Sequence, residues 1–176
     1  AQQVPDVEFV ICGTGADAES LQSQASGITN IYWLTPQPSE RFNDLLNCAD
    51  MHLLPQRAGA ADLVMPSKLT GMMASGRPVV ACANAGTQIA DVVQGRGKVV
   101  DAGDAQAFAK AITWLVDHPE DRKDLGRAAR TYAVTHLSRE AILHQFECDL
   151  REVSGRVAST ELPPESNRLS EVEAVG

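Results

Sequence analysis

Residues 66–69, Pro-Ser-Lys-Leu, combine the residue types best suited to holding an anion. Proline is favoured in the first turn of a helix, where its missing N–H is not needed. The amides that follow have no partner within the helix and lie at its positive end. Lys68 adds a full charge beside them, so the stretch predicts a phosphate-binding helix start. The same residues also fit a well-packed helix whose lysine is merely solvated.

Further along this helix, Ser67, Gly71 and Ser75 form a stripe of small residues that would let another group approach closely. Two other loops follow apolar runs, as the loop before Pro66 does. They are Gly13-Thr14-Gly15 and Thr35-Pro36-Gln37. Ligands of open α/β sheets gather at the carboxyl ends of the strands, where these loops are expected.

None of these loops carries a complete catalytic motif. Gly13 and Gly15 predict a tight turn, but Ala18 interrupts a dinucleotide-binding GxGxxG pattern. Arg57, in the loop before Pro66, either approaches the same anion as Lys68 or is solvated. His52 lies inside an apolar run and is interpreted as a core histidine. The sequence contains no HExxH motif, no Ser-His-Asp order and no paired carboxylates in matched contexts, so the catalytic residues stay unassigned.

The net charge and the spacing of the cysteines argue against several classes of function. The 176 residues carry a net charge of −8, which argues against nonspecific binding to nucleic acid or to an anionic membrane. No apolar run reaches the ~18 residues that a membrane span needs. Cys12, Cys48, Cys82 and Cys148 lack metal-ligand spacing, so they are predicted to be buried, reduced thiols in a cytoplasmic protein.

Short apolar runs alternate with helical patterns through residue 103, which predicts a parallel sheet covered on both faces by helices. The expected strands are residues 7–12, 30–34, 51–54, 78–81 and 98–100. The expected helices between them are residues 16–25, 39–48 with Ser39 as cap, 67–75 and 87–93. From residue 104 the pattern is helical only, with Pro119 and Ser138 opening the last two helices. Residues 1–153 are therefore predicted to form one domain, and residues 154–176 a polar, disordered tail.

Several stretches together resemble one family. They are FVICGTGADAESL, NIYWLTPQPSERFNDLLNCADMHLLPQ, ADLVMPSKLTGMMASGRPVVA and YAVTHLSREAILHQFE. In this order they resemble the carboxyl-terminal domain of GT-B glycosyltransferases of group 1 (family 4), especially the branch associated with colanic-acid-type exopolysaccharide. The resemblance covers residues 6–150 and implies a Rossmann-like, doubly wound sheet followed by helices.

The resemblance also implies a chemistry: retaining sugar transfer from a nucleotide-sugar donor, with no metal or other cofactor. Carried over position by position, the loop that meets the base is Pro36 and Gln37, and the glycine turn at the cleft is Gly13 and Gly15. The segment that meets the diphosphate and sugar is Pro66, Ser67, Lys68 and Leu69. In this family the acceptor, here expected to be a lipid-linked saccharide, is held by an amino-terminal domain.

The sequence departs from the family at two acidic positions. Two glutamates eight positions apart usually flank this helix, and here they are Leu63 and Gly71. Asp62 is a stand-in for the first of them. The family's first strand, with its glycine-rich turn and basic pair, has no counterpart in the sequence. Its absence would leave the first and third expected strands without their shared neighbour.

We therefore expect the donor-binding half of a bacterial glycosyltransferase, cytoplasmic or peripheral at the inner face of the membrane, and inactive without its other half. Two alternatives stay open: a non-catalytic module that binds a nucleotide or nucleotide-sugar, and a GT-B-fold sugar-nucleotide epimerase. Epimerases should carry acidic and histidine pairs in the cleft loops, and these are not found in the sequence.

Overall fold

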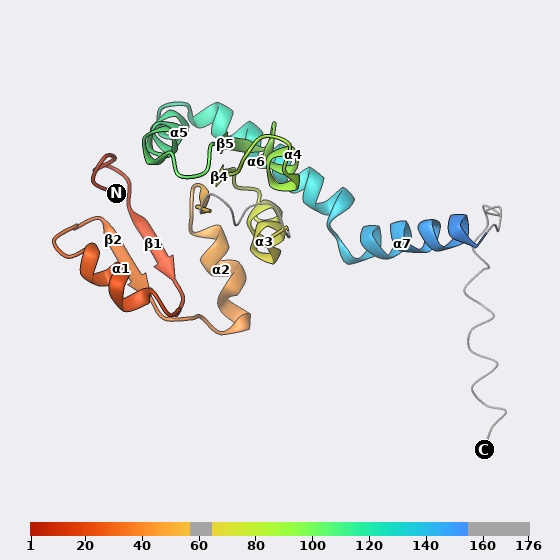
Figure 1. Ribbon diagram of the computed structural model, residues 1–176, viewed down its shortest axis with the longest axis horizontal. Coiled ribbons are helices and arrows are strands. Elements are labelled where there is room, and N and C mark those ends of the chain that lie inside the picture. Colours follow the sequence, from red (N-terminus) through yellow and green to blue (C-terminus); the bar gives the residue numbers. More distant parts are fainter. Residues whose placement is uncertain (57–64, 155–176) are drawn as a thin grey trace, which may run out of the picture. The chain divides into compact units, whose positions relative to one another are not determined.

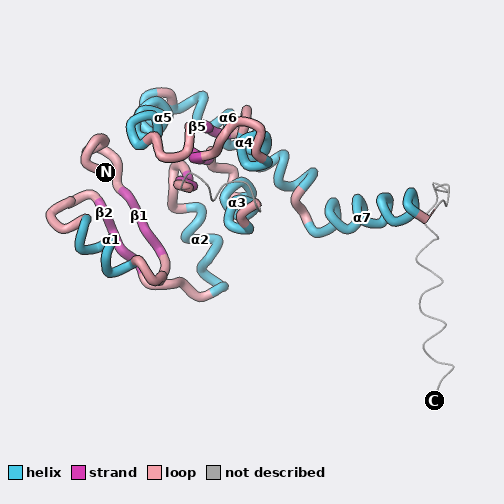
Figure 2. The backbone as a smooth tube through the Cα atoms, viewed as in Figure 1, coloured by secondary structure: helices cyan, strands magenta, loops and turns pink. Residues whose placement is uncertain are grey.

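A computed structural model describes residues 1–56 and 65–154. The chain divides into two compact units, Ala1–Leu137 and Ser138–Gly176. The described strands are β1 (Phe9–Cys12), β2 (Ile31–Leu34), β3 (His52–Leu54), β4 (Val79–Cys82) and β5 (Gly97–Val100). The helices of the first unit are α1 (Ala18–Gln24), the 3-10 turn η1 (Ser39–Arg41), α2 (Phe42–Asn47), α3 (Ser67–Ala74), α4 (Gln88–Val93), α5 (Ala105–Asp117) and α6 (Pro119–His136) (Figures 1 and 2). The predicted α/β class is confirmed.

Strand β4 is the centre of the main core. It pairs in parallel with β3 on one edge and with β5 on the other, and all four of its residues are buried. On one face, Val79 and Ala81 pack with residues of α3, α4 and α6, among them Leu69, Ile89 and Ala129. On the other face, Val80 packs with Ile112 and Leu115 of α5 and with Val4. Strand β4 is therefore covered on both faces, as predicted.

Strands β1 and β2 form a second, separate parallel pair. The pair is visible as adjacent arrows beside α1 in Figure 1. Val10, Tyr32 and Leu34 lie on one side of this pair and remain exposed. The prediction that all strands are covered on both faces is therefore wrong for β1 and β2, because no described element packs over the apolar side chains on this side of the pair.

Helix α3 is fixed from the side by α6. Gly126 of α6 lies against the turn that ends α3, and a Cβ at this glycine would sit 2.2 Å from the carbonyl oxygen of Gly76. The guanidinium of Arg130 donates to the carbonyl of Ala74 in the same turn. Since backbone meets backbone at Gly126, no side-chain rotation could make room for a larger residue.

His52 of β3 also holds the end of helix α3 in place. The Nε2 atom of His52 lies 2.9 Å from Ser75 Oγ, and the Ser75 hydroxyl donates to the carbonyl of Met72 at 2.6 Å. Because the hydroxyl hydrogen is used, Nε2 must donate to Ser75. Burial, and then the nearby charge of Arg77, lower the pKa of His52 to about 4. The prediction of a satisfied core histidine is confirmed.

Two local predictions are wrong. Pro38, rather than Ser39, stands at the start of η1, and Ser39 Oγ donates to Glu40 instead of capping the helix. All four cysteines are free, but Cys82 alone is buried; Cys12 is half-buried, and Cys48 and Cys148 are exposed. The first error is local, because the neighbouring Glu40 carboxylate takes the Ser39 hydroxyl. The second arises because an apolar pattern does not say how closely neighbouring elements pack.

The described part of the second unit is helix α7 (Arg139–Val153). Ser138 is its N-cap and accepts from the Ala141 amide at 3.2 Å, as predicted. One side of the helix carries exposed apolar residues, namely Ile142, Leu143, Phe146, Leu150 and Val153. Of the predicted tail, the structure describes Ser154 alone.

We predict that Gly126→Ala lowers the free energy of unfolding by about 1–3 kcal/mol, the usual cost of forcing extra atoms into a packed core. Urea denaturation monitored by circular dichroism measures this loss. Gly71→Ala is the matched control, because it also adds one methyl group to a helical glycine. There the closest neighbour is the flexible end of Leu46 at 3.3 Å, and helix propensity gains up to ~1 kcal/mol. Equal losses in the two variants would contradict the backbone contact at Gly126.

We also predict an acid-dependent loss of stability from His52. Its pKa is about 4 in the folded chain and about 6.5 when unfolded, so between these values the unfolded chain binds the extra proton. The contribution is complete above about pH 6.5 and is lost as the pH falls towards 4, in total on the order of 2–3 kcal/mol. His52→Gln keeps a side-chain donor but cannot titrate. The free energy of unfolding of the variant should therefore change less over this window; identical pH slopes would contradict the assignment.

Candidate functional site

The loops after β1 and β2 are joined to each other at the carboxyl ends of these strands. The thiol of Cys12 donates to the carbonyl of Thr35 at 3.3 Å, and the Gln37 carboxamide nitrogen donates to the same oxygen at 3.0 Å. Gln37 is half-buried, while Pro36 is exposed. The structure thus brings together two of the loops predicted to contribute to the site, with Gln37 held in place and Pro36 free to meet a ligand.

Gly13 is required by the backbone at the end of β1. Its φ of +145° is one that side-chain-bearing residues rarely adopt, and its amide donates to Leu34, which prolongs the pairing with β2. Gly15 accepts from the amide of Ala18 at the start of α1 and has no such restriction. Both glycines are exposed, and a Cβ would meet nothing within 4 Å at either position. The predicted tight turn is present and open to a ligand.

The start of α3 provides free donors. Ser67 and Lys68 are the first two helical residues, so their amides have no partner inside the helix. Pro66 is the N-cap, and no side chain caps this end. Ser67 and Lys68 are both exposed, and Lys68 forms no ion pair with any described residue. The helix start therefore offers amides, a hydroxyl and an ammonium group to one anion.

Two predicted details of this helix start need correction. Pro66 lies just before the first turn rather than in it, with φ −64° and ψ 128°. The amide of Leu69 is not free, because it donates to the carbonyl of Pro66 at 2.9 Å, and its side chain is fully buried. Leu69 therefore anchors the helix in the core, and the donors left for a ligand are those of Ser67 and Lys68.

The stripe of small residues on α3 serves packing in this structure. The position of a Cβ on Gly71 lies 3.3 Å from Leu46 and 3.6 Å from Phe42, so α2 is the group that approaches. Ser75 is engaged by His52, as described above. The expected close approach at Gly71 is therefore made by α2 of the same chain.

Three residues named in the sequence analysis lie outside the described residues. They are Arg57, Asp62 and Leu63, all within residues 57–64. Their segment connects Gln56, just after β3, to Met65, just before α3. The candidate site is therefore built here from Gly13, Pro36, Gln37, Ser67 and Lys68.

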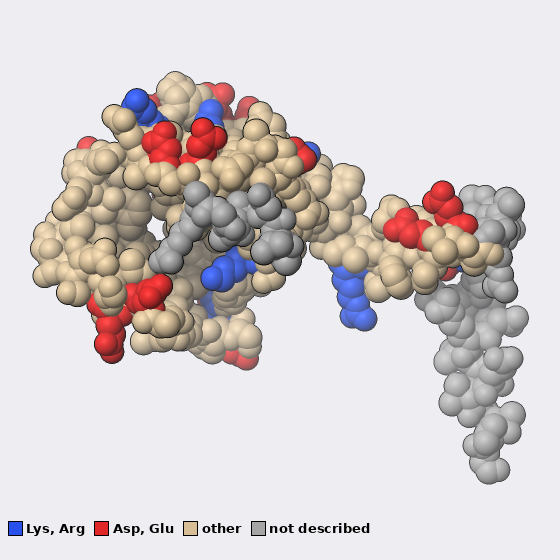
Figure 3. All heavy atoms as spheres, in the orientation of Figure 1, with Lys and Arg blue, Asp and Glu red and all other residues tan. Residues whose placement is uncertain are grey.

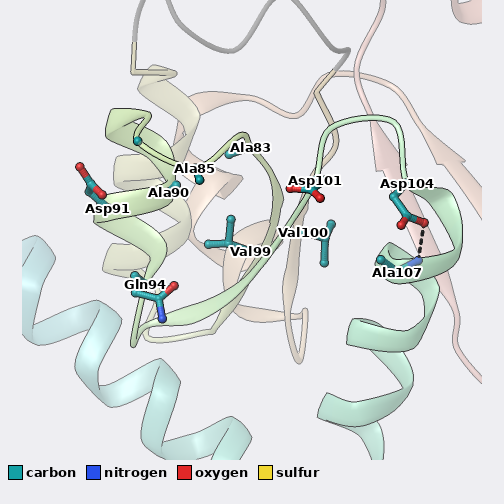
Figure 4. A pocket seen from close by; sticks show the side chains of 11 residues that line it. Ala83, Ala85, Ala90, Asp91, Gln94, Val99, Val100, Asp101, Asp104 and Ala107 are labelled. Atoms are coloured by element: carbon teal, nitrogen blue, oxygen red, sulfur yellow. Dashed lines mark hydrogen bonds between the residues drawn. The ribbon is translucent and has the colours of Figure 1, made fainter.

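A cavity that the sequence did not suggest lies at the carboxyl ends of β4 and β5. Its volume is about 510 Å³, and its floor is aliphatic, with Ala83, Ala90, Val99 and Val100 among the lining residues (Figure 4). The alternation of short apolar runs gives no signal for such a hollow, because it depends on how β5, α4, α5 and the loops between them meet.

The chemistry of this cavity does not suit a phosphate. Its rim carries the carboxylates of Asp91, Asp101 and Asp104, and Asp104 accepts from the Ala107 amide at 2.8 Å as the cap of α5. Acidic side chains are visible on the face where Figure 1 labels α5 and β5 (Figure 3). Negative charge repels a polyanion, so among the described residues the start of α3 is the better place for an anion.

Two further observations concern the described residues alone. Over residues 1–56 and 65–154, no group of three or more His, Cys, Asp or Glu side chains could hold a metal ion. In the same ranges, no helix has the length and apolar content to cross a membrane.

Comparison with known proteins gives a consistent family. The family model described as "Glycosyl transferases group 1" matches residues 1–118. The putative colanic acid biosynthesis glycosyl transferase WcaI of Escherichia coli is 32% identical over 148 residues, which is 81% of this chain and 35% of that protein. The D-rhamnosyltransferase WbpZ of Pseudomonas aeruginosa is 29% identical over 73% of this chain and 34% of its own length. The chain thus spans about a third of the length of the curated relatives it matches.

Solved structures share the fold. Anabaena Alr3699/HepE in complex with UDP superposes with a TM-score of 0.73 at 15% identity, over 86% of this chain and 43% of that one. WaaG, a glycosyltransferase involved in lipopolysaccharide biosynthesis, superposes with a TM-score of 0.61 at 16% identity, over 85% of this chain and 41% of that one. At these identities the likeness shows the fold and no more, and it supports the Rossmann-like architecture predicted from the sequence.

Proposed function

This chain belongs to the group 1 glycosyl transferase family, and on that premise we propose that it is the donor-binding half of a retaining glycosyltransferase. Its ligand is a nucleotide-sugar, and the whole protein transfers the sugar to an acceptor in bacterial exopolysaccharide assembly. The observation that carries the proposal is the uncapped start of α3, where Lys68 stands beside free amides.

Each part of the site has a role in this proposal. The amides of Ser67 and Lys68 and the Lys68 ammonium bind the diphosphate, because charge-assisted donors at a helix start favour phosphate oxygens. Pro36 and Gln37 meet the base, and the open turn of Gly13 and Gly15 lets the nucleotide come close to the backbone. Arg57 and Asp62, in the segment before α3, add a second cation and a contact to the sugar.

The nature of the substrate is supported by relatives. HepE has been crystallised with UDP and with UDP-glucose, which makes a uridine diphosphate sugar the first donor to test. WcaI is named for colanic acid biosynthesis, an exopolysaccharide, and WbpZ is a D-rhamnosyltransferase. The proposed acceptor is a lipid-linked saccharide held by another domain, and the proposed protein works in the cytoplasm or at the inner face of the membrane.

The proposal assigns no metal to the reaction. In this proposal Lys68 and Arg57 supply positive charge to a leaving diphosphate, a task that a divalent cation fulfils in many other transferases. The described residues at the carboxyl ends of β1 and β2 carry no carboxylate pair that would suit a cation. Chelation should therefore leave donor binding unchanged.

We predict that Lys68→Ala weakens the binding of UDP by roughly 1–3 kcal/mol, the range for a charge-assisted hydrogen bond. Titration calorimetry of the 176-residue chain measures the dissociation constant, expected at ~0.1–1 mM before the change. Lys110→Ala, in the middle of α5, removes an equally positive, exposed lysine away from the loops and is the control. An unchanged constant in Lys68→Ala, or an equal loss in both variants, would remove Lys68 from the site.

We further predict that the 176-residue chain binds the donor but transfers no sugar, whereas the full-length protein does both. Transfer requires the acceptor to be held against the anomeric carbon, and such positioning supplies much of an enzyme's rate. The measurement is acceptor-dependent release of UDP from UDP-glucose, with and without EDTA. Analysis of the anomeric configuration of the product tests retention. Release by the chain alone, or an inverted product, would contradict the proposal.

A further inference from the structure

A buried side-chain oxygen without a partner lies just beyond the carboxyl end of β3. Gln56 is half-buried, its Oε1 atom is fully covered, and no described residue donates a hydrogen bond to that oxygen. An unpaired buried acceptor destabilises a fold, and such groups are few in native proteins. Gln56 therefore costs the chain stability unless another molecule completes its hydrogen bond.

Among the described residues one other buried side-chain polar atom lacks a partner, and it lies elsewhere. This atom is Nε of Arg77, whose guanidinium still donates to the carbonyl of Asn47 through Nη2 at 3.2 Å. Arg77 precedes β4, so it lies at the amino end of that strand. Ligands of parallel sheets bind at the carboxyl ends, which is where Gln56 lies.

The side chain of Gln56 lies on the face of β3 that α3 covers. Leu54 packs in the cluster that contains Leu69 of α3, whereas Leu53 packs in the cluster on the other face. Side chains of an extended chain alternate between the two faces, and Pro55 keeps the residue before it extended. Two positions after Leu54, Gln56 therefore returns to the face of α3.

Gln56 is also level with the start of α3. Because β3 and β4 are parallel, α3 between them runs back against the direction of β3. His52, at the beginning of β3, meets Ser75 after the end of α3, with 2.9 Å between Nε2 and Oγ. From this contact, Gln56 lies about 13 Å along an extended chain, and Ser67 lies about 12 Å back along the helix. The carboxamide of Gln56 and the free amides of Ser67 and Lys68 therefore lie at the same end.

The groups at this end suit a ligand that carries both an anion and a hydroxyl group. The amides of Ser67 and Lys68 donate hydrogen bonds, and they suit phosphate oxygens. The Oε1 atom of Gln56 accepts, so it needs an O–H or N–H group from the ligand. An ionised diphosphate has no such hydrogen to give. A sugar hydroxyl next to the diphosphate supplies the missing donor.

We propose that Gln56 is a specificity-determining residue whose Oε1 atom accepts a hydrogen bond from one hydroxyl group of the donor sugar. A nucleotide diphosphate alone leaves this oxygen unpaired, so the chain gains affinity when the sugar is attached. A sugar without that hydroxyl is rejected, because the buried acceptor then stays unpaired in the complex. This inference deepens the proposed function and rests on it.

The first test measures the melting temperature of the free 176-residue chain. Gln56→Met keeps the length of the side chain and removes the unpaired acceptor, so the melting temperature should rise by about 2–5 °C. The control is Gln106→Met, which makes the same change at an exposed glutamine in the first turn of α5. A melting temperature of Gln56→Met equal to or below that of the control would mean that Oε1 has a partner within the chain, and would overturn the proposal.

The second test compares two ligands by titration calorimetry, UDP and UDP-glucose. In Gln56→Met the dissociation constant for UDP should stay as it is in the unchanged chain, whereas the constant for UDP-glucose should rise about tenfold. Gln106→Met should leave both constants unchanged. Equal changes for the two ligands in Gln56→Met, or no change for either, would contradict a contact to the sugar.

Analogues of UDP-glucose that lack one hydroxyl each identify the group that Gln56 accepts from. One analogue should bind the unchanged chain about tenfold more weakly than UDP-glucose does, and should bind Gln56→Met with the same constant as UDP-glucose. Losses that are equal in both chains for every analogue would contradict the proposal.

The titrations also separate this inference from the function on which it rests. If UDP shows no saturable binding to the unchanged chain, the proposed nucleotide-sugar site fails, and the role of Gln56 fails with it. If UDP binds, but Gln56→Met leaves the constant for UDP-glucose unchanged, the role of Gln56 alone is refuted.

Discussion

A parallel strand is stable when both of its edges are hydrogen-bonded and both of its faces are covered, and β4 is where this chain meets that requirement in full. Its apolar residues hold α3, α4 and α6 on one side and α5 on the other. Through Leu69 and Met73, both fully buried, this core fixes the axis of α3. The exposed start of the same helix carries Ser67 and Lys68. The core around β4 therefore holds these two residues in position without the help of a ligand.

Strands β1 and β2 do not meet this requirement in full, and this affects the loops that follow them. β1 and β2 carry the glycine turn and the Thr35–Gln37 loop, but their layer is held by fewer contacts than β4. The Cys12–Thr35–Gln37 hydrogen bonds tie the two loops to each other, so they would move as one piece.

The sequence predicted the parts that depend on local pattern. Five apolar runs became strands within two residues of the expected ends, and Ser138 caps the last helix as predicted. His52 was identified as a core residue because it lies inside an apolar run. Several errors concern contacts between distant segments, namely α2 against Gly71 and the exposure of Cys12, Cys48 and Cys148. Two others are local, because the amide of Leu69 donates to Pro66 and the Ser39 hydroxyl donates to Glu40. The cavity at the carboxyl ends of β4 and β5 was missed because no periodicity records where distant segments meet.

The central claim is that a nucleotide diphosphate binds at the start of α3, and it is tested most directly by NMR. The 176-residue chain, labelled with ¹⁵N, is titrated with UDP, and shifts of each amide are followed. The account predicts the largest shifts at Ser67 and Lys68, with smaller ones at Gly13, Gly15 and Gln37. Shifts concentrated at Ala85, Gly86 and Asp101, around the acidic cavity, would contradict it, as would the absence of any saturable shift at the start of α3.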